Sequence, residues 1–162
     1  MSLLEKSNKT QELSMVFTNT LIELISENDK IIVLDADLAA ASKFSKIRKE
    51  FPGRFINAGI AEANMIGVAA GLSLRGFIPY VHSFSPFATR RCYDQLYLSG
   101  GYAQTNIKVF GSDPGVCAAK NGATHTTFED IALMRMIPNS MIFDPADGFQ
   151  LRWLIKELSK HH

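Results

Sequence analysis

The sequence lacks the features that mark several common functional classes. It contains 2 cysteines and 1 tryptophan in 162 residues, and 17 Lys and Arg against 16 Asp and Glu leave a net charge of +1. Cys92 and Cys117 make neither a disulfide framework nor a metal pair, and they fit a reducing cytoplasm. A near-neutral chain carries no electrostatic footprint for nucleic acid or for an anionic membrane.

Longer signals are missing from the sequence as well. No apolar run approaches the roughly 20 residues of a membrane-spanning helix, and Met1–Lys6 lacks the basic and apolar segments of a secretory signal. We find no phosphate-cradling glycine loop, no nucleophile elbow and no metal-spaced ligand set. We therefore expect a cytoplasmic protein that binds no nucleic acid, no membrane and no metal of its own.

The pattern that is present predicts alternating helices and strands. Apolar residues are 46% and charged residues 20%, which is a globular composition. Periodicity and glycine or proline breaks predict helices at 11–27, 40–50, 61–75, 87–99, 127–136 and 147–160, and strands at 31–34, 55–57, 77–83, 107–111 and 140–143. This order predicts an α/β fold, a doubly wound and mainly parallel sheet with helices on both faces.

The chain divides into one domain with short ends. We expect an N-terminal extension at residues 1–10, a single domain at 11–160, and the remnant of an affinity tag at 161–162. Residues 112–125 show no periodicity and form a long loop, and such loops in compact domains are usually functional or disordered.

Glu62 is the first candidate for chemistry. It lies in the first turn of a helix that is otherwise rich in Ala and Gly. One explanation is that the carboxylate complements the helix dipole. A helix that is apolar on all sides is buried in a core or an interface, so the carboxylate would also be desolvated and would need a partner. Such a group can share a proton with a heterocyclic nitrogen.

The other candidates also follow predicted strands, where α/β sheets bind ligands. Asp37 caps the next helix or faces a ligand. Phe84 and Phe87 belong to the core or form a stacking wall for a flat ring. His125, in a loop with Asn121, is solvated or orients an anionic or hydroxylated substrate. The residues alone support half of a site for a planar heterocycle.

Five motifs, in order, resemble the pyrimidine-binding domain of thiamine diphosphate enzymes of the transketolase group. They span about residues 11–157 and are Asp35-Ala36-Asp37-Leu38, Gly59-Ile60-Ala61-Glu62, Ser83-Phe84-Ser85-Pro86-Phe87, Asn121-Gly122-Ala123-Thr124-His125, and Ile137-Pro138-Asn139 leading to Phe143-Asp144-Pro145-Ala146-Asp147. The resemblance implies the thiamine diphosphate-binding fold and the transfer of a two-carbon ketol unit between sugar phosphates.

The resemblance also implies a role for each candidate residue. In that family the glutamate that matches Glu62 hydrogen-bonds N1′ of the aminopyrimidine and promotes the imino tautomer, whose 4′ nitrogen deprotonates C2 of the thiazolium. The remaining positions line the cofactor's rings, at Asp37, Leu38, Phe84 and Phe87, or contact the substrate, at Asn121 and His125.

This sequence departs from the family pattern in ways that affect specificity more than the cofactor. Ala61 and Ala63 flank Glu62 where many transketolases have Arg and His, and Asn121 replaces an Asp. 1-Deoxyxylulose-5-phosphate synthase and the β subunit of 2-oxo acid dehydrogenases are alternative relatives. A non-catalytic, doubly wound binding module is an alternative of another class.

The family's diphosphate-binding motif, Gly-Asp-Gly with a downstream Asn, is missing from this chain. The resemblance therefore implies that a partner domain or subunit holds the diphosphate and its Mg²⁺, and that the chain alone is inactive. The helix with Ala63, Gly67, Ala70 and Gly71 invites close packing, so we also expect the isolated chain to form homodimers.

Overall fold

The computed structural model describes residues 12–161, so the expected extension at 1–10 and His162 lie outside the described residues. The sheet has four parallel strands in the order β2-β1-β3-β4. They are β1 (Ile31–Asp35), β2 (Phe55–Asn57), β3 (Ile78–Phe84) and β4 (Lys108–Ser112). The predicted α/β fold with a parallel sheet is confirmed.

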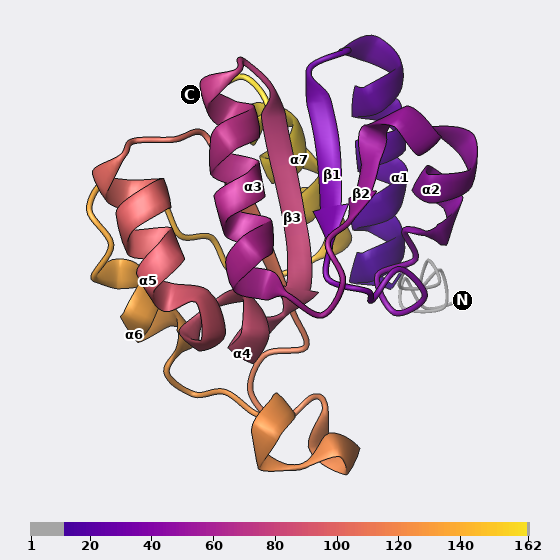
Figure 1. The fold of residues 1–162 in the computed structure, drawn as a ribbon. Helices are drawn as coiled ribbons and strands as arrows, with labels where there is room; N and C mark the ends of the chain where they lie inside the picture. Colours follow the sequence, from indigo (N-terminus) through magenta and orange to yellow (C-terminus); the bar gives the residue numbers. More distant parts are fainter. Residues whose placement is uncertain (1–11, 162) are drawn as a thin grey trace, which may run out of the picture.

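Helices cover both faces of this sheet (Figure 1). One face carries α1 (Leu13–Glu27), α2 (Ser45–Glu50) and α7 (Gly148–Leu158). The other carries α3 (Glu62–Leu74), α5 (Tyr93–Gln95) and α6 (Asp130–Arg135). The short α4 (Ser85–Ala88) continues directly from β3.

The alternation of strand side chains supplies two separate cores. In β1, Ile31 and Val33 pack into the core under α1, whereas Ile32 and Leu34 pack into the core under α3. All five residues of β1 are buried, as expected for a central parallel strand covered on both faces.

The helix α3 is less buried than its composition predicts. Met65, Ile66 and Ala69 are fully buried, but Val68 and Leu74 are 36% and 74% exposed. The small residues that were expected to allow close packing therefore differ in burial. Ala70 lies in the core, whereas Gly67 and Gly71 are exposed. An all-round apolar helix thus leaves one face open in this chain.

The predicted helix at 87–99 is wrong in its continuity and its end. Pro86 lies in the first turn of α4 as expected, but the chain then forms a 3₁₀ turn, α5 and a π-helix at Leu96–Tyr102. The π-helix runs through Gly100 and Gly101, which were expected to end the helix. A Cβ at Gly101 would lie 2.6 Å from Ile137 Cγ2, so close packing is the physical reason for that glycine.

The fifth strand predicted at 140–143 is also wrong. Residues 140–145 are irregular, and Met141 is 62% exposed. The Ser140 amide donates to Ile137 O at 3.3 Å and its hydroxyl donates to Met134 O at 2.9 Å. These bonds tie the start of the segment to the end of α6, and β4 remains an edge strand. The expected helix at 40–50 is shortened to α2.

Candidate functional site

The candidate site lies at the carboxyl edge of the sheet. From β1 the chain passes to β2 on one side, and β3 then pairs on the other side of β1. Parallel sheets bind ligands at such a switch point, where successive connections diverge. The segment after β4, orange in Figure 1, projects from this same edge.

Glu62 is the buried acid of the site. It begins α3, and only 2% of the residue is exposed. Arg91 Nη1 lies 2.9 Å from Oε1 and 3.0 Å from Oε2, and the Ser83 hydroxyl donates to Oε1 at 3.3 Å. The structure therefore supplies the partner that a desolvated carboxylate needs, and it also places the carboxylate where the helix dipole favours it.

Arg91 connects the acid to an aromatic wall. Its Cζ lies 3.6 Å from the centroid of the Phe87 ring, and its side chain is 42% exposed. This arginine was not among the residues predicted from the sequence. Its contact with Phe87 forms across the break between α4 and the 3₁₀ turn at Arg90–Cys92, which the sequence did not predict.

The aromatic candidates lie close together in edge-on contacts. The rings of Phe84 and Phe87 are 6.2 Å apart at 63°, and the His125 ring lies 4.9 Å from Phe87 and 5.6 Å from Phe84. Both phenylalanines are partly exposed, so they line the surface of the site and do not belong to the core.

Arg90 holds the loop that carries His125. Its guanidinium donates to the Thr126 and Thr124 carbonyls, each at 3.3 Å, and pairs with Glu129 at 2.6 Å. Beside it, the Ser85 hydroxyl donates to Asp130 Oδ2 at 2.7 Å. The bonds of Arg90 fasten the end of the predicted loop to the 3₁₀ turn at Arg90–Cys92, and the bond of Ser85 joins α4 to α6. Phe128 N and Arg90 also donate to Glu129, which lowers the pKa of that carboxyl to about 2.

The remaining candidates are Asp37, Leu38 and Asn121. Asp37 is exposed with φ 63°, and its carboxylate accepts from Asn57 Nδ2 at 2.9 Å, so it does not cap the next helix. Leu38 is partly buried beside it. Asn121 is exposed on the projecting segment. The structure thus brings Glu62, Phe84, Phe87 and His125 together and leaves Asn121 at the periphery.

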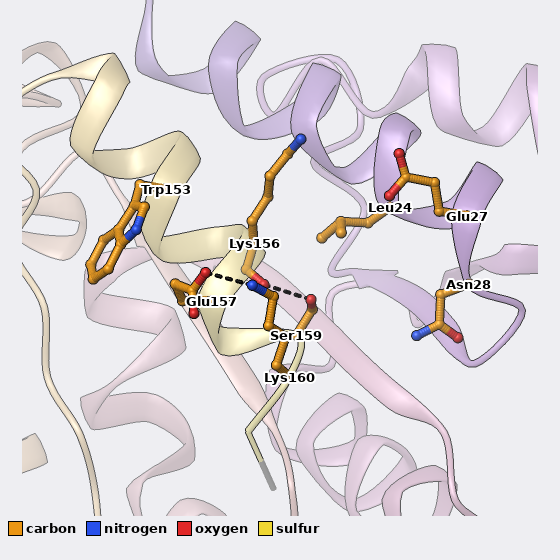
Figure 2. Close-up of a pocket in the computed structure, with 8 residues that line it drawn as sticks. All are labelled: Leu24, Glu27, Asn28, Trp153, Lys156, Glu157, Ser159 and Lys160. Atoms are coloured by element: carbon orange, nitrogen blue, oxygen red, sulfur yellow. Dashed lines mark hydrogen bonds and ion pairs between the residues drawn. The ribbon is translucent and has the colours of Figure 1, made fainter.

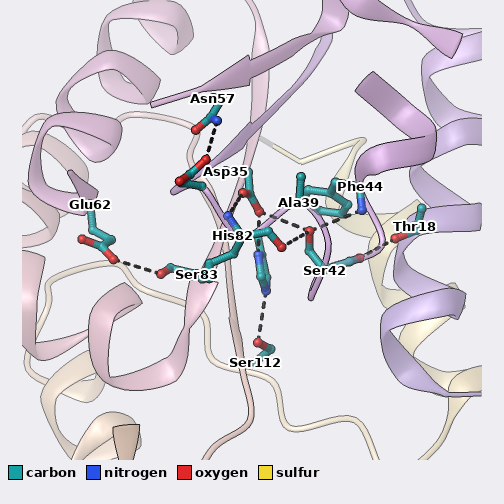
Figure 3. A network of polar contacts seen from close by, with 12 residues as sticks. Thr18, Asp35, Ala39, Ser42, Phe44, Asn57, Glu62, His82, Ser83 and Ser112 are labelled. Atoms are coloured by element: carbon teal, nitrogen blue, oxygen red, sulfur yellow. Dashed lines mark hydrogen bonds and ion pairs between the residues drawn. The ribbon is translucent and has the colours of Figure 1, made fainter. Parts of the chain in front are cut away.

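A second polar network lies behind the site, centred on a histidine for which the sequence supported no role (Figure 3). His82 Nδ1 lies 2.9 Å from Asp35 Oδ2, and its Nε2 lies 3.1 Å from the Ser112 hydroxyl. The Ser42 hydroxyl donates to the same Asp35 oxygen at 3.2 Å. The ends of β1, β3 and β4 are joined in this way.

Two nearby features affect the chemistry that the site can perform. Burial, and secondarily the charge of Glu62, raises the pKa of the Cys92 thiol to about 12, which makes it a poor nucleophile. Among residues 12–161, no group of three or more His, Cys, Asp or Glu side chains could hold a metal ion. The described part of the chain also has no helix long and apolar enough to cross a membrane.

A surface recess lies at the amino-terminal end of the strands, opposite the candidate site. It is formed by the ends of α1 and α7, with Leu24, Asn28, Trp153 and Lys160 among its lining (Figure 2). Lys160 pairs with Glu157 at 2.6 Å. None of the candidate site residues lines this recess, so it is separate from the candidate site.

Known proteins similar to this chain carry the same domain. The family model for the transketolase pyrimidine-binding domain matches residues 9–161. The 6-deoxy-6-sulfo-D-fructose transketolase subunit SqwH of Clostridium sp. (strain MSTE9) is 48% identical over 145 residues, which is 90% of this chain and 45% of that protein. An apulose-4-phosphate transketolase subunit of Phocaeicola vulgatus is 34% identical over 142 residues, covering 88% and 46%.

A solved structure agrees with these sequence matches. The structure titled "Split gene transketolase, inactive beta4 tetramer" superposes with a TM-score of 0.81 at 42% identity, over 91% of this chain and 47% of that one. The chain therefore spans about half the length of these relatives. By its sequence and its fold, this chain belongs to the transketolase pyrimidine-binding domain family.

Proposed function

We propose that this chain is the pyrimidine-binding part of a thiamine diphosphate-dependent transketolase. One observation carries the proposal: a carboxylate that is 2% exposed lies beside partly exposed aromatic rings at the switch point of the sheet. These side chains fit an aminopyrimidine, since the carboxylate can hydrogen-bond a ring nitrogen and the rings of Phe84 and Phe87 offer faces for stacking. The family of the chain supports the same cofactor.

Each site residue then has a task in the proposed reaction. Glu62 shares a proton with a ring nitrogen, and Ser83 fixes one of its oxygens. Phe84, Phe87 and Leu38 exclude water from the ring. Asp37 lies at the rim of the same edge. When it is bound, thiamine diphosphate supplies the carbanion chemistry of ketol transfer.

The substrate class in the proposal is a ketose that carries an anion at its far end. The names of two relatives, a sulfofructose transketolase subunit and an apulose-4-phosphate transketolase subunit, support this class, which includes sugar phosphates. His125 and Asn121 are the side chains proposed to contact the sugar. The relatives named here are transketolase subunits, which favours transketolase over 1-deoxyxylulose-5-phosphate synthase or a 2-oxo acid dehydrogenase.

The site is proposed to be completed by a partner. A diphosphate-binding subunit or domain would hold the diphosphate and its Mg²⁺, and this chain alone would be inactive. The names of the relatives as subunits support this division. The solved relative titled an inactive β4 tetramer supports self-association without the partner, for which a homodimer is our proposal. The free thiols of Cys92 and Cys117 suit the proposed cytoplasmic location.

The test is ketol transfer and thiamine diphosphate binding by the chain, with and without a diphosphate-binding transketolase subunit. We expect activity only in the mixture, and a loss of about 100-fold or more in Glu62→Gln, because the proton-sharing group is removed. Glu50→Gln, an exposed glutamate on α2, is the matched control. Transfer by the isolated chain would contradict the split site, and full activity of Glu62→Gln would contradict the role of Glu62.

A further inference from the structure

The guanidinium of Arg91 lies in the candidate site as a flat ligand would. Its Nη1 donates to both oxygens of Glu62, at 2.9 and 3.0 Å. Its Cζ lies 3.6 Å from the centroid of the Phe87 ring. A guanidinium is planar and delocalised, so it stacks on an aromatic face while its edge donates to a carboxylate.

A planar nitrogen heterocycle would use the same two contacts. A ring nitrogen that carries the shared proton would donate to the buried carboxylate, and the face of the ring would lie on an aromatic ring. The oxygens of Glu62 and the exposed face of Phe87 cannot serve both groups at once. We propose that Arg91 is a latch, which occupies the ring slot between Glu62 and Phe87 and is displaced when such a heterocycle binds. This inference rests on the proposed function, in which the heterocycle is the pyrimidine of thiamine diphosphate.

The contacts of the two neighbouring arginines explain why Arg91 is the one that can move. Arg90 is anchored to Glu129 and to backbone carbonyls of the loop at 123–126. Within the described residues, the Arg91 guanidinium hydrogen-bonds to Glu62 alone and stacks on Phe87 alone. Its side chain is 42% exposed, against 2% for that of Glu62, so it can return to water without unpacking the core.

The latch also gives the buried carboxylate a partner when no ligand is bound. A buried carboxylate without a partner is unfavourable, because it loses its hydration and gains nothing in return. Arg91 compensates Glu62 until a ligand arrives. The Ser83 hydroxyl, at 3.3 Å, remains on Glu62 after Arg91 has left.

The first test compares binding of 4-amino-2,5-dimethylpyrimidine to the full chain and to Arg91→Met, by calorimetry or NMR titration. Without the latch we expect the Kd to fall by about five- to tenfold, because the ligand no longer displaces a partly exposed ion pair. Arg48→Met, which removes an exposed arginine on α2, is the control and should leave the Kd unchanged. Arg91→Lys keeps the charge without the flat face and should lie between.

Weaker or unchanged binding in Arg91→Met would overturn the latch, because a fixed positioning residue would be needed for affinity. Absence of binding to both proteins would overturn it too, since the slot would not be a ring site. Neither result affects the proposed function, which fails separately if ketol transfer by the mixture with the partner subunit is indifferent to Glu62.

A second measurement uses the unmodified sequence, so it does not depend on a variant that folds. In protein labelled with ¹³C and ¹⁵N arginine, the Arg91 side-chain signals should show the ring-current shift of Phe87. Saturation with the pyrimidine should move them to the position of a solvated arginine, with Arg48 unchanged. Arg91 signals that stay in place at saturating pyrimidine would overturn the latch.

Discussion

His82 and Asp35 form a hydrogen-bonded pair in the interior of the protein, with 2.9 Å between Nδ1 and Oδ2 and side chains that are 1% and 0% exposed. The two residues lie opposite each other in the register of β3 and β1. The other oxygen of Asp35 accepts from the Leu38 amide. The pair therefore ties the turn that carries Asp37 and Leu38 to the central strands of the sheet.

Removal of Asp35 should destabilise the fold strongly. In Asp35→Ala, His82, Ser42 and the Leu38 amide lose a buried acceptor, and breaking a buried pair costs about 3 kcal/mol or more. Asp29→Ala, an exposed aspartate in the turn before β1, should change the free energy of unfolding by less than about 0.5 kcal/mol. Urea unfolding measures both. Equal, small losses would mean that the network adds no stability.

Two adjacent glycines of the π-helix should respond differently to a methyl group. A Cβ at Gly101 would lie 2.6 Å from Ile137 Cγ2 and 3.0 Å from Pro138 O, whereas a Cβ at Gly100 meets nothing within 4 Å. We expect Gly101→Ala to cost about 1–3 kcal/mol by overpacking and Gly100→Ala to be neutral or stabilising. Thermal melts of the two variants make the comparison. A matching loss at Gly100 would point to the π-helix backbone as the cause.

The fold could be predicted from the sequence where the local pattern and the tertiary environment agree. The β-branched run of β1 fits a buried strand, and the amphipathic spacing of α1 fits a helix packed on a core. Both elements were predicted within a few residues. The strand at 140–143 failed because a four-residue apolar run does not identify its hydrogen-bonding partner. Here Ser140 bonds to the end of α6 instead. The interruption at 88–93 of the helix predicted at 87–99 depends on tertiary packing, which the spacing of apolar residues does not reveal.

The candidate site was predicted in part, for a related reason. Glu62, Phe84, Phe87 and His125 lie in strand-end segments, so topology alone brings them to one edge. Arg91 and His82 were missed because their roles depend on neighbours far apart in sequence: Glu62 is 29 residues from Arg91, and Asp35 is 47 from His82. A histidine within an apolar strand was the available signal, since a buried polar group requires a partner.

The two cysteines should differ sharply in their reaction with iodoacetamide. Cys92 is fully buried, its thiol donates to the Phe87 and Ala88 carbonyls, and its pKa is raised to about 12. Cys117 is exposed. Since the thiolate is the reacting form, intact mass at pH 8 should give one adduct in the native protein and two in urea. A Cys117→Ser variant should give none until it unfolds, and a native second adduct would contradict the burial of Cys92.

Glu23 links α1 to α7 and should make stability depend on acidity. Its carboxylate accepts from Arg152 at 2.7 and 2.6 Å and pairs with Lys156 at 3.0 Å. Hydrogen bonds from Arg152 and then Lys156 lower the pKa of Glu23 from 4.5 to about 2. Because the folded pKa is the lower one, the unfolded chain binds more protons between these values. The contribution of Glu23 is therefore complete above pH 4.5 and is lost as the pH falls toward 2.

Glu23→Gln isolates that contribution. The side chain of Glu23 is 38% exposed, so solvent screening limits the contribution to less than about 1 kcal/mol. The difference between wild type and variant should be constant above about pH 5 and shrink as the pH falls to 3. Urea unfolding at several pH values and at low salt measures the difference, and 1 M salt should reduce it because the pair lies at the surface. Glu50→Gln is the control, an exposed glutamate on α2. A difference that stays constant with pH would assign the role of Glu23 to packing of its methylenes and not to its charge.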